Sequence, residues 1–212
     1  MQEEVLAQEV ISRLREEYSG FVTALKFDTP WQLIVAVALS AQTTDENVNS
    51  VTKTLFEKYS SPQEIAQAPI QELEQDVYST GYYKSKARNI KKMCTQLIQE
   101  HNSQVPDTMS ELVSLAGVGR KTANVILHIL YDKAEGIVMD THIARVTHRL
   151  GFTKKKSPTK AEKKMMKVLP RSDWREWGDL LIQHGREICE SRKPKCEECV
   201  LNDICPSAYT IP

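Results

Sequence analysis

Four cysteines near the C-terminus constrain this 212-residue chain more than any other feature. Cys189, Cys196, Cys199 and Cys205 follow the pattern C-x6-C-x2-C-x5-C within the last 24 residues. Because the N-terminus lacks a basic and then apolar signal pattern, we do not expect a disulfide framework. Closely spaced thiolates are typical ligands of zinc or of an iron–sulfur cluster, and the spacing alone does not separate the two. The fifth cysteine, Cys94, lies in a predicted helix and is expected to be a buried thiol.

The rest of the chain has the pattern of many short helices. Period-2 alternation is scarce, and helix boundaries are frequent. Thr29 and Pro30 predict a helix start before residues 31–40, which are apolar nearly all round and should form a central core helix. Thr108 and Glu111 form a capping box that predicts another start. We therefore expect an all-α protein with no sheet.

Basic residues are clustered although the net charge of the chain is zero. Residues 1–135 carry 13 basic and 18 acidic side chains, a sum of −5, whereas residues 136–212 carry 15 and 10, a sum of +5. Between residues 154 and 171 there are eight basic residues and one acid. Such clusters are expected on a surface that binds a polyanion, and they also occur on ordinary solvated helices. The change of charge indicates a boundary near residue 135.

The segment 115–123, Leu-Ala-Gly-Val-Gly-Arg-Lys-Thr-Ala, places two glycines before a predicted helix. Gly117 and Gly119 permit backbone angles closed to other residues, and the start of the helix can bind a phosphate. A structural turn is the alternative. Lys121 follows Arg120 and faces the positive end of the helix dipole, which favours the uncharged amine, a nucleophile toward aldehyde carbons. A lysine that contacts phosphate is the alternative.

Asp140 ends an apolar run at the start of another predicted helix. An acid at this position is a typical N-cap. If the loop at 133–136 returns the chain, Asp140 comes close to Lys121. A carboxylate there could stabilise a developing sugar cation and assist proton transfer.

Taken together, these residues resemble the endonuclease III family of DNA glycosylases, which are helix-hairpin-helix base-excision enzymes. Besides the terminal cysteines, the matching elements are Leu-Ser-Ala-Gln-Thr-Thr-Asp at 39–45, the hairpin with Lys121, and Val-Met-Asp-Thr-His at 138–142. Their order and spacing agree over essentially the whole chain. The resemblance implies that Cys189, Cys196, Cys199 and Cys205 hold a [4Fe–4S] cluster.

The resemblance also implies a fold of two all-α lobes with a DNA-binding cleft between them. Residues 22–134 would form a six-helix barrel domain, with the helix-hairpin-helix at about 108–132. Residues 1–21 and 135–212 would form the iron–sulfur cluster domain. The expected boundary agrees with the change of charge near residue 135.

For the matching residues, the resemblance implies particular roles on a base that is flipped out of the duplex. Lys121 would attack the sugar C1′ and hold the sugar as an imine, and Asp140 would be the essential carboxylate. Gln42 would fill the gap in the stack, and Tyr82, in place of a common aliphatic wedge, could stack on bases. The other expected DNA contacts are Gly117, Gly119, Arg120, Arg192, Lys193 and Lys195. Weaker matches near the pocket are Ser40, Asp45 and His142.

The implied function is that of a bifunctional DNA glycosylase and AP lyase that removes oxidised pyrimidines. Its partner would be double-stranded DNA with damaged bases or abasic sites, and we expect a cytoplasmic monomer of prokaryotic type. The longest apolar stretch, residues 33–39, is too short to span a membrane. The alternatives are a mismatch-specific glycosylase for thymine or adenine, which Lys121 disfavours, and a non-catalytic iron–sulfur DNA-binding module, which Lys121 and Asp140 together disfavour.

Overall fold

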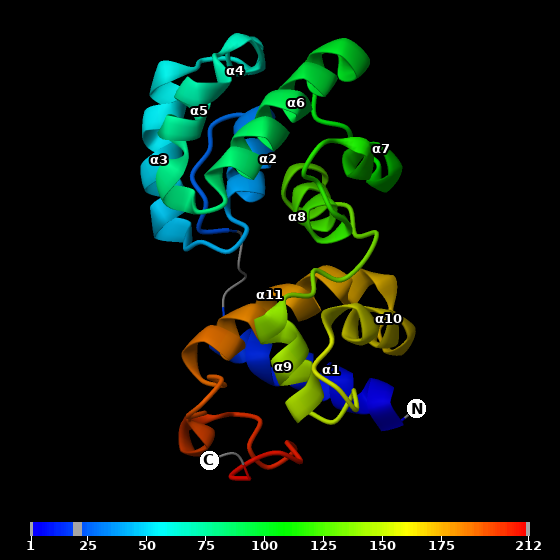
Figure 1. Ribbon diagram of the computed structural model, residues 1–212. Helices are drawn as coiled ribbons and strands as arrows, with labels where there is room; N and C mark the ends of the chain where they lie inside the picture. Colours follow the sequence, from blue (N-terminus) through cyan, green and yellow to red (C-terminus); the bar gives the residue numbers. More distant parts are fainter. Residues whose placement is uncertain (1, 19–22, 211–212) are drawn as a thin grey trace. The chain divides into compact units, whose positions relative to one another are not determined.

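The computed structural model describes residues 2–18 and 23–210, and within them the chain is helical and has no strand (Figure 1). The all-α prediction is therefore confirmed. The chain divides into two compact units, which we call the cysteine unit, residues 1–22 with 134–212, and the hairpin unit, residues 23–133. The expected boundary at residues 21 and 22 lies outside the described residues.

The hairpin unit is built around one helix that is buried on nearly every side. This helix, α2, is apolar throughout apart from Gln32, and its residues from Trp31 to Val37 are all buried, as its sequence predicts. The longest helix, α6, packs against α2, α4 and α5. The helices of this unit are α2 (Pro30–Leu39), α3 (Asp45–Lys58), α4 (Pro62–Gln67), α5 (Ile70–Asp76), the 3-10 turn η1 (Tyr78–Thr80), α6 (Tyr83–His101), α7 (Met109–Ser114) and α8 (Arg120–Tyr131).

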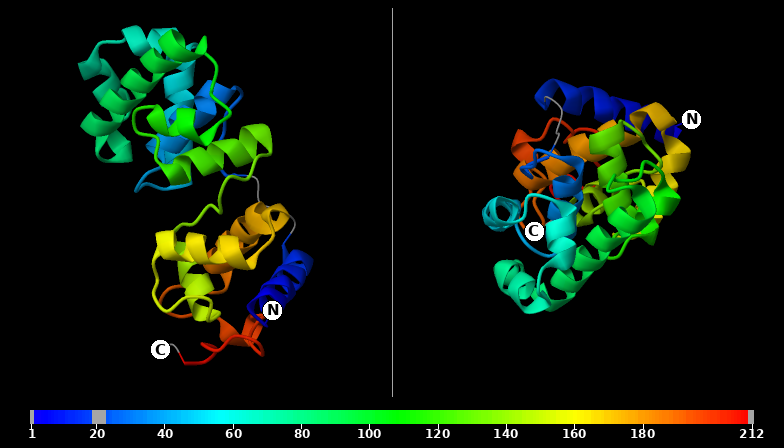
Figure 2. Two further views of the ribbon diagram at one scale, coloured as in Figure 1. Left: turned by 90° about the vertical axis from the view of Figure 1, so that its right-hand side faces the viewer. Right: turned by 90° about the horizontal axis from the view of Figure 1, so that it is seen from above.

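The cysteine unit joins the N-terminal helix to the C-terminal part of the chain. Helix α1, blue in Figure 2, packs against α10 and α11. Arg15 on α1 donates two hydrogen bonds to the carboxylate of Glu176, at 2.7 and 2.8 Å. Trp177 is fully buried and meets Phe152 edge to face. The helices are α1 (Gln2–Glu17), α9 (Thr141–Arg149), α10 (Pro158–Val168), η2 (Arg171–Asp173), α11 (Trp174–Glu187) and η3 (Cys196–Glu198).

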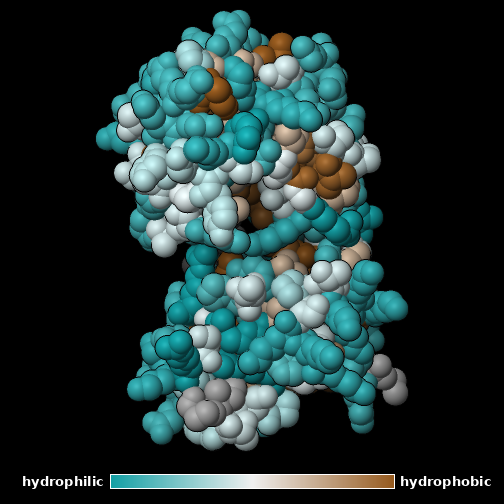
Figure 3. Space-filling view, viewed as in Figure 1, coloured by the Kyte–Doolittle hydropathy of each residue, from teal (hydrophilic) through white to brown (hydrophobic). Residues whose placement is uncertain are grey.

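Hydrophilic residues cover most of the face of each unit that Figure 3 shows. Among the described residues, no helix is both long and apolar enough to cross a lipid bilayer.

Candidate functional site

A tight turn between α7 and α8 carries the two glycines. Val118 is buried, and its N–H donates to the carbonyl of Leu115 at 3.1 Å, which closes the turn. Gly117 has a φ of 79°, and a Cβ there would lie 3.0 Å from the side chain of Asn89, so both conformation and space require glycine. Gly119 has a φ of −92° and a ψ of 172°, an extended conformation open to any residue. Of the two glycines, Gly117 alone therefore uses a backbone angle that is closed to other residues.

The start of α8 is open toward solvent. Gly119 is its N-cap, and apart from Gly119 and its two chain neighbours no atom lies within 4 Å of the position that a Cβ of Gly119 would take. The first turn contains no acidic residue that would occupy the positive end of the helix dipole. Arg120 and Lys121 are the first two residues of the helix, and both are exposed. The geometry suits an anion such as a DNA phosphate, and it presents the amine of Lys121 outward.

Asp140 is the N-cap of α9, so the N-cap interpretation is correct. Its Oδ1 accepts the backbone N–H groups of His142 and Ile143, both at 2.8 Å. Its Oδ2 lies 3.2 Å from Nδ1 of His142. The Asp140 side chain is 13% exposed. One carboxylate oxygen therefore holds the helix start, and the other faces the ring of His142. Lys121 belongs to the hairpin unit and Asp140 to the cysteine unit, and their approach to each other stays a prediction.

The two residues expected to enter the DNA stack have left-handed backbones. Gln42 has a φ of 57° and Tyr82 a φ of 49°. Gln42 is exposed, and Tyr82 is 71% exposed. This region is costly for residues other than glycine, and such residues cluster at functional sites. Nearby, half-buried Ser40 is the C-cap of α2, and half-buried Asp45 is the first residue of α3.

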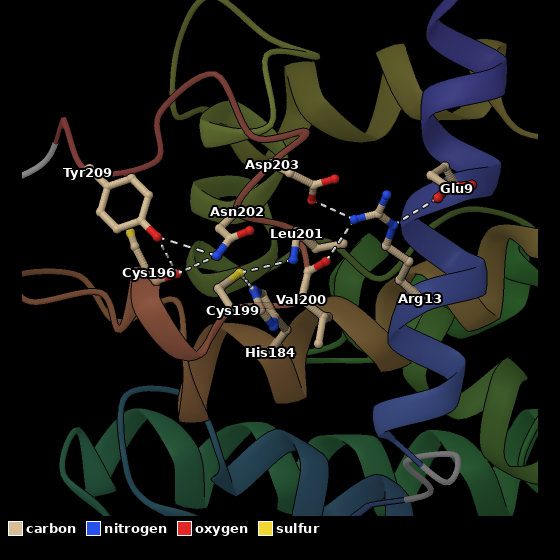
Figure 4. A network of polar contacts seen from close by, with 10 residues as sticks. All are labelled: Glu9, Arg13, His184, Cys196, Cys199, Val200, Leu201, Asn202, Asp203 and Tyr209. Carbon is tan, nitrogen blue, oxygen red and sulfur yellow. Dashed lines mark hydrogen bonds and ion pairs between the residues drawn. The ribbon is translucent and has the colours of Figure 1, made fainter.

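The four C-terminal cysteines line one cavity of the cysteine unit. All four are free, half-buried thiols: Cys189, Cys196, Cys199 and Cys205. Figure 4 shows the part of the cavity around Cys199. The Sγ of Cys199 accepts the N–H of Leu201 at 3.4 Å and lies 3.5 Å from Nε2 of His184. Cys94 is a fully buried thiol in α6, as predicted, and burial raises its pKa to about 12.

The chemistry of this cavity fits an anionic cluster with four thiolate ligands. Among the described residues that line it, none is acidic, and Arg149 and Lys195 are cationic. A guanidinium N–H of Arg149 donates to Sγ of Cys189 at 3.1 Å. Across residues 2–18 and 23–210, no three or more His, Cys, Asp or Glu side chains converge to hold a single metal ion. All four cysteines nevertheless line the cavity, and four thiolates are the ligand set of an iron–sulfur cluster.

An exposed basic loop lies between the first two of these cysteines, and it carries Arg192, Lys193 and Lys195. Buried Arg149 holds the N-terminal end of this loop by donating hydrogen bonds to the carbonyls of Glu190 at 2.6 Å and Ser191 at 3.0 Å. The sequence reasoning missed Arg149. A basic residue on the inward face of an amphipathic helix was the available signal.

Comparison with known proteins gives matches over nearly the whole chain. The family model described as HhH-GPD superfamily base excision DNA repair protein matches residues 35–171, and the iron–sulfur binding domain of endonuclease III matches residues 189–205. Endonuclease III of Synechocystis sp. is 43% identical over 202 residues, which cover 95% of this chain and 92% of that protein. Endonuclease III of Escherichia coli (strain K12) is 40% identical over 200 residues, 93% of each chain.

Solved structures also match nearly the whole chain. A trapped endonuclease III–DNA covalent intermediate has a TM-score of 0.91 at 39% identity, covering 98% of this chain and 97% of that one. A thermostable thymine-DNA glycosylase has a TM-score of 0.80 at 21% identity, a similarity of fold alone.

Proposed function

The chain belongs to the endonuclease III family of base-excision DNA repair enzymes, and from this premise we propose that it removes oxidised pyrimidines from duplex DNA through Lys121 and Asp140. It is a bifunctional DNA glycosylase and AP lyase. Its four terminal cysteines hold a [4Fe–4S] cluster. In this proposal the hairpin unit, for which seven α-helices are described, corresponds to the domain that the family's fold calls the six-helix barrel, and the cysteine unit is the iron–sulfur cluster domain.

Lys121 is the nucleophile of the proposed reaction. With the damaged base flipped out, the neutral amine attacks C1′, the C1′–N bond breaks, and the base leaves with the electron pair and takes up a proton. The attached nitrogen then loses a proton, and the C1′–O4′ bond breaks as O4′ takes up a proton, which opens the sugar ring. Loss of the last N–H proton leaves an imine between Nζ and C1′. Loss of a proton from C2′ then breaks the C3′–O bond, which cuts the strand 3′ to the lesion. Water hydrolyses the imine and releases Lys121.

Asp140 is the carboxylate that assists this chemistry. Its Oδ1 is held by two N–H groups, so Oδ2 is the oxygen available to stabilise positive charge on the sugar and to accept a proton from the amine. Ser40, Asp45 and His142 would line the base pocket. The cluster supplies a structural cross-link that shapes the basic loop around Arg192.

DNA binding is divided among three features in this proposal. Gln42 fills the gap left by the flipped nucleotide, and Tyr82 stacks beside the lesion. The hairpin residues Gly117, Gly119 and Arg120 contact the backbone phosphates, and so do Arg192, Lys193 and Lys195. The enzyme would act as a cytoplasmic monomer on chromosomal DNA.

The observation that carries the proposal is an exposed lysine in the first turn of α8, directly after the glycine turn. Borohydride reduction of the imine on duplex DNA containing thymine glycol tests it. The wild-type chain and the matched variant Lys53→Gln, which alters an exposed lysine on α3, should give a covalent adduct. Lys121→Gln should give none. An adduct that persists in Lys121→Gln contradicts the role of Lys121, and trapping at abasic sites without excision of thymine glycol contradicts the proposed substrate.

A further inference from the structure

Lys86 is a buried lysine that the proposed chemistry does not use. It lies on α6, is 7% exposed, and burial lowers its pKa. Its ammonium donates to the carbonyl of Leu39 at 2.8 Å and to the carbonyl of Thr80 at 2.7 Å. A buried ammonium group is costly unless it is hydrogen-bonded, so these two contacts account for its place in the core.

Both acceptors lie at the base of a segment that carries a left-handed residue. Leu39 ends α2, where carbonyls lack partners within the helix and attract a cation. Gln42 follows it three residues later, and Tyr82 follows Thr80 two residues later. The backbone N–H of Lys86 also donates to the carbonyl of Tyr82, at 3.0 Å. One residue thus joins the Gln42 segment to the Tyr82 segment.

Asn47 forms a second bridge between the same two segments. Its Nδ2 donates to Oγ1 of Thr43 and to the carbonyl of Ser79, both at 2.9 Å. The hydroxyl of Ser79 donates back to Oδ1 of Asn47 at 3.3 Å. Thr43 directly follows Gln42, and Ser79 directly precedes Thr80. The segments 39–43 and 79–82 are far apart in the sequence, and two sets of hydrogen bonds, one from Lys86 and one from Asn47, therefore join them.

We propose that Lys86 is a positioning residue that holds Gln42 and Tyr82 at a fixed separation, so that both enter the DNA at one lesion. This inference rests on the roles assigned to Gln42 and Tyr82 above. Residues other than glycine keep a left-handed conformation only where the surrounding structure holds them in it, and the hydrogen bonds of Lys86 and Asn47 provide such support here. A pair that is fixed before binding also avoids the entropic cost of ordering two loops on the DNA.

A double-mutant cycle on the two inserting residues tests this. The probe is a duplex with a tetrahydrofuran abasic-site analogue, which cannot form an imine, so binding is measured without chemistry. If Lys86 couples the pair, the losses of affinity in Gln42→Ala and Tyr82→Ala are non-additive in the wild-type background and additive in Lys86→Met. Lys86→Met alone should weaken binding to this duplex by about tenfold, with undamaged DNA unaffected.

Lys91→Met is the matched control, because Lys91 is on the same helix and donates to the carbonyl of Ala68 at 2.5 Å, in another part of the unit. Equal loss of lesion preference in Lys86→Met and Lys91→Met overturns the proposal, and so does coupling that persists in Lys86→Met. If Lys86→Met fails to fold, Asn47→Ala tests the second bridge and should weaken the coupling; unchanged coupling overturns the proposal. Failure of borohydride trapping would refute the assigned chemistry and leave this binding measurement intact.

Discussion

Asp140 caps helix α9 by accepting the backbone N–H of Ile143 at 2.8 Å. The same oxygen, Oδ1, accepts the N–H of His142, and only Oδ2 faces the His142 ring. Asp140 is thus both a structural cap and the proposed carboxylate of the reaction. The two tasks call for different properties of the side chain, since capping needs an acceptor and the chemistry needs a negative charge.

Asp140→Asn should separate these tasks. The amide oxygen can still accept the two N–H groups, so the free energy of unfolding should stay close to the wild-type value. Asp140→Ala removes the cap and should cost about 1 kcal/mol. Both variants should lose base excision by about 100- to 10,000-fold. Thermal unfolding and single-turnover excision measure the two effects.

Thr108→Ala is the control for loss of a cap alone, because Thr108 accepts the N–H of Glu111 at the start of α7. It should lose stability by a similar amount and keep its excision rate. Near wild-type excision by Asp140→Asn would show that the charge is not needed.

The backbone strain at Tyr82 predicts opposite effects on stability and on binding. Alanine at this position keeps the unfavourable left-handed conformation, whereas glycine relieves it. Tyr82→Gly should therefore be more stable than Tyr82→Ala by about 1 kcal/mol. Both should bind a lesion duplex more weakly than wild type, because both lack the ring. Denaturant unfolding and fluorescence anisotropy check the two parts, and an equal stability of the two variants would argue against strain.

Local patterns in the sequence predicted most of the helices, because the signals lie within a few residues of one another. The apolar run of α2 and the Thr108 cap of α7 are of this kind. The conformations of Gln42 and Tyr82 could not be predicted this way, since neither is glycine or asparagine. Both conformations occur beside long-range hydrogen bonds: Lys86 bonds to a carbonyl 47 residues away, and Asn47 to one 32 residues away.

Local sequence patterns likewise predicted only part of the candidate site. Cysteine spacing identified the thiols, and the glycine turn identified the start of α8. The donor from Arg149 to Cys189 could not be found from spacing, because it joins residues 40 apart through packing of α9 on the C-terminal loop. The close approach of Gly117 to Asn89 on α6 likewise joins residues that are far apart in the sequence.

Removal of one terminal thiol should release the cluster. Cys205→Ser takes away one of four ligands, so the iron content should fall well below about four atoms per chain, and the visible absorption should disappear. Cys94→Ala, which alters the buried thiol of α6, should keep both. Iron analysis and the absorption spectrum give the result. Full iron content in Cys205→Ser would exclude this residue as a ligand.

The basic loop should set the salt dependence of DNA binding. If Arg192, Lys193 and Lys195 each contact a phosphate, their combined replacement by alanine lowers the slope of log affinity against log salt by about 3. Lys92→Ala, an exposed lysine of α6, is the control and should leave the slope unchanged. Titrations of undamaged duplex at several salt concentrations measure it. An unchanged slope in the triple variant would mean that the loop does not contact DNA.

Asp179 on α11 predicts a pH dependence of stability. Burial raises its pKa to about 6, although Arg175 lies 3.5 Å away and acts in the opposite direction. An acid whose pKa is higher in the folded than in the unfolded chain binds more protons when folded. Its effect on stability is therefore most favourable below about pH 4 and is lost as the pH rises through about 6.

At pH 7 the Asp179 carboxylate thus destabilises the fold, and Asp179→Asn should raise the free energy of unfolding there by about 1–2 kcal/mol. This gain is smaller than the free energy that corresponds to the whole pKa shift, because the side chain stays partly exposed and the variant loses the contact with Arg175. At pH 4 the variant should gain only a small part of this, because the wild-type carboxyl is already protonated in the folded state and only partly ionised in the unfolded chain. Denaturant unfolding at both values measures the difference, with Asp28→Asn, an exposed acid, as control. An equal gain at pH 4 and pH 7 would assign the effect to packing and not to charge.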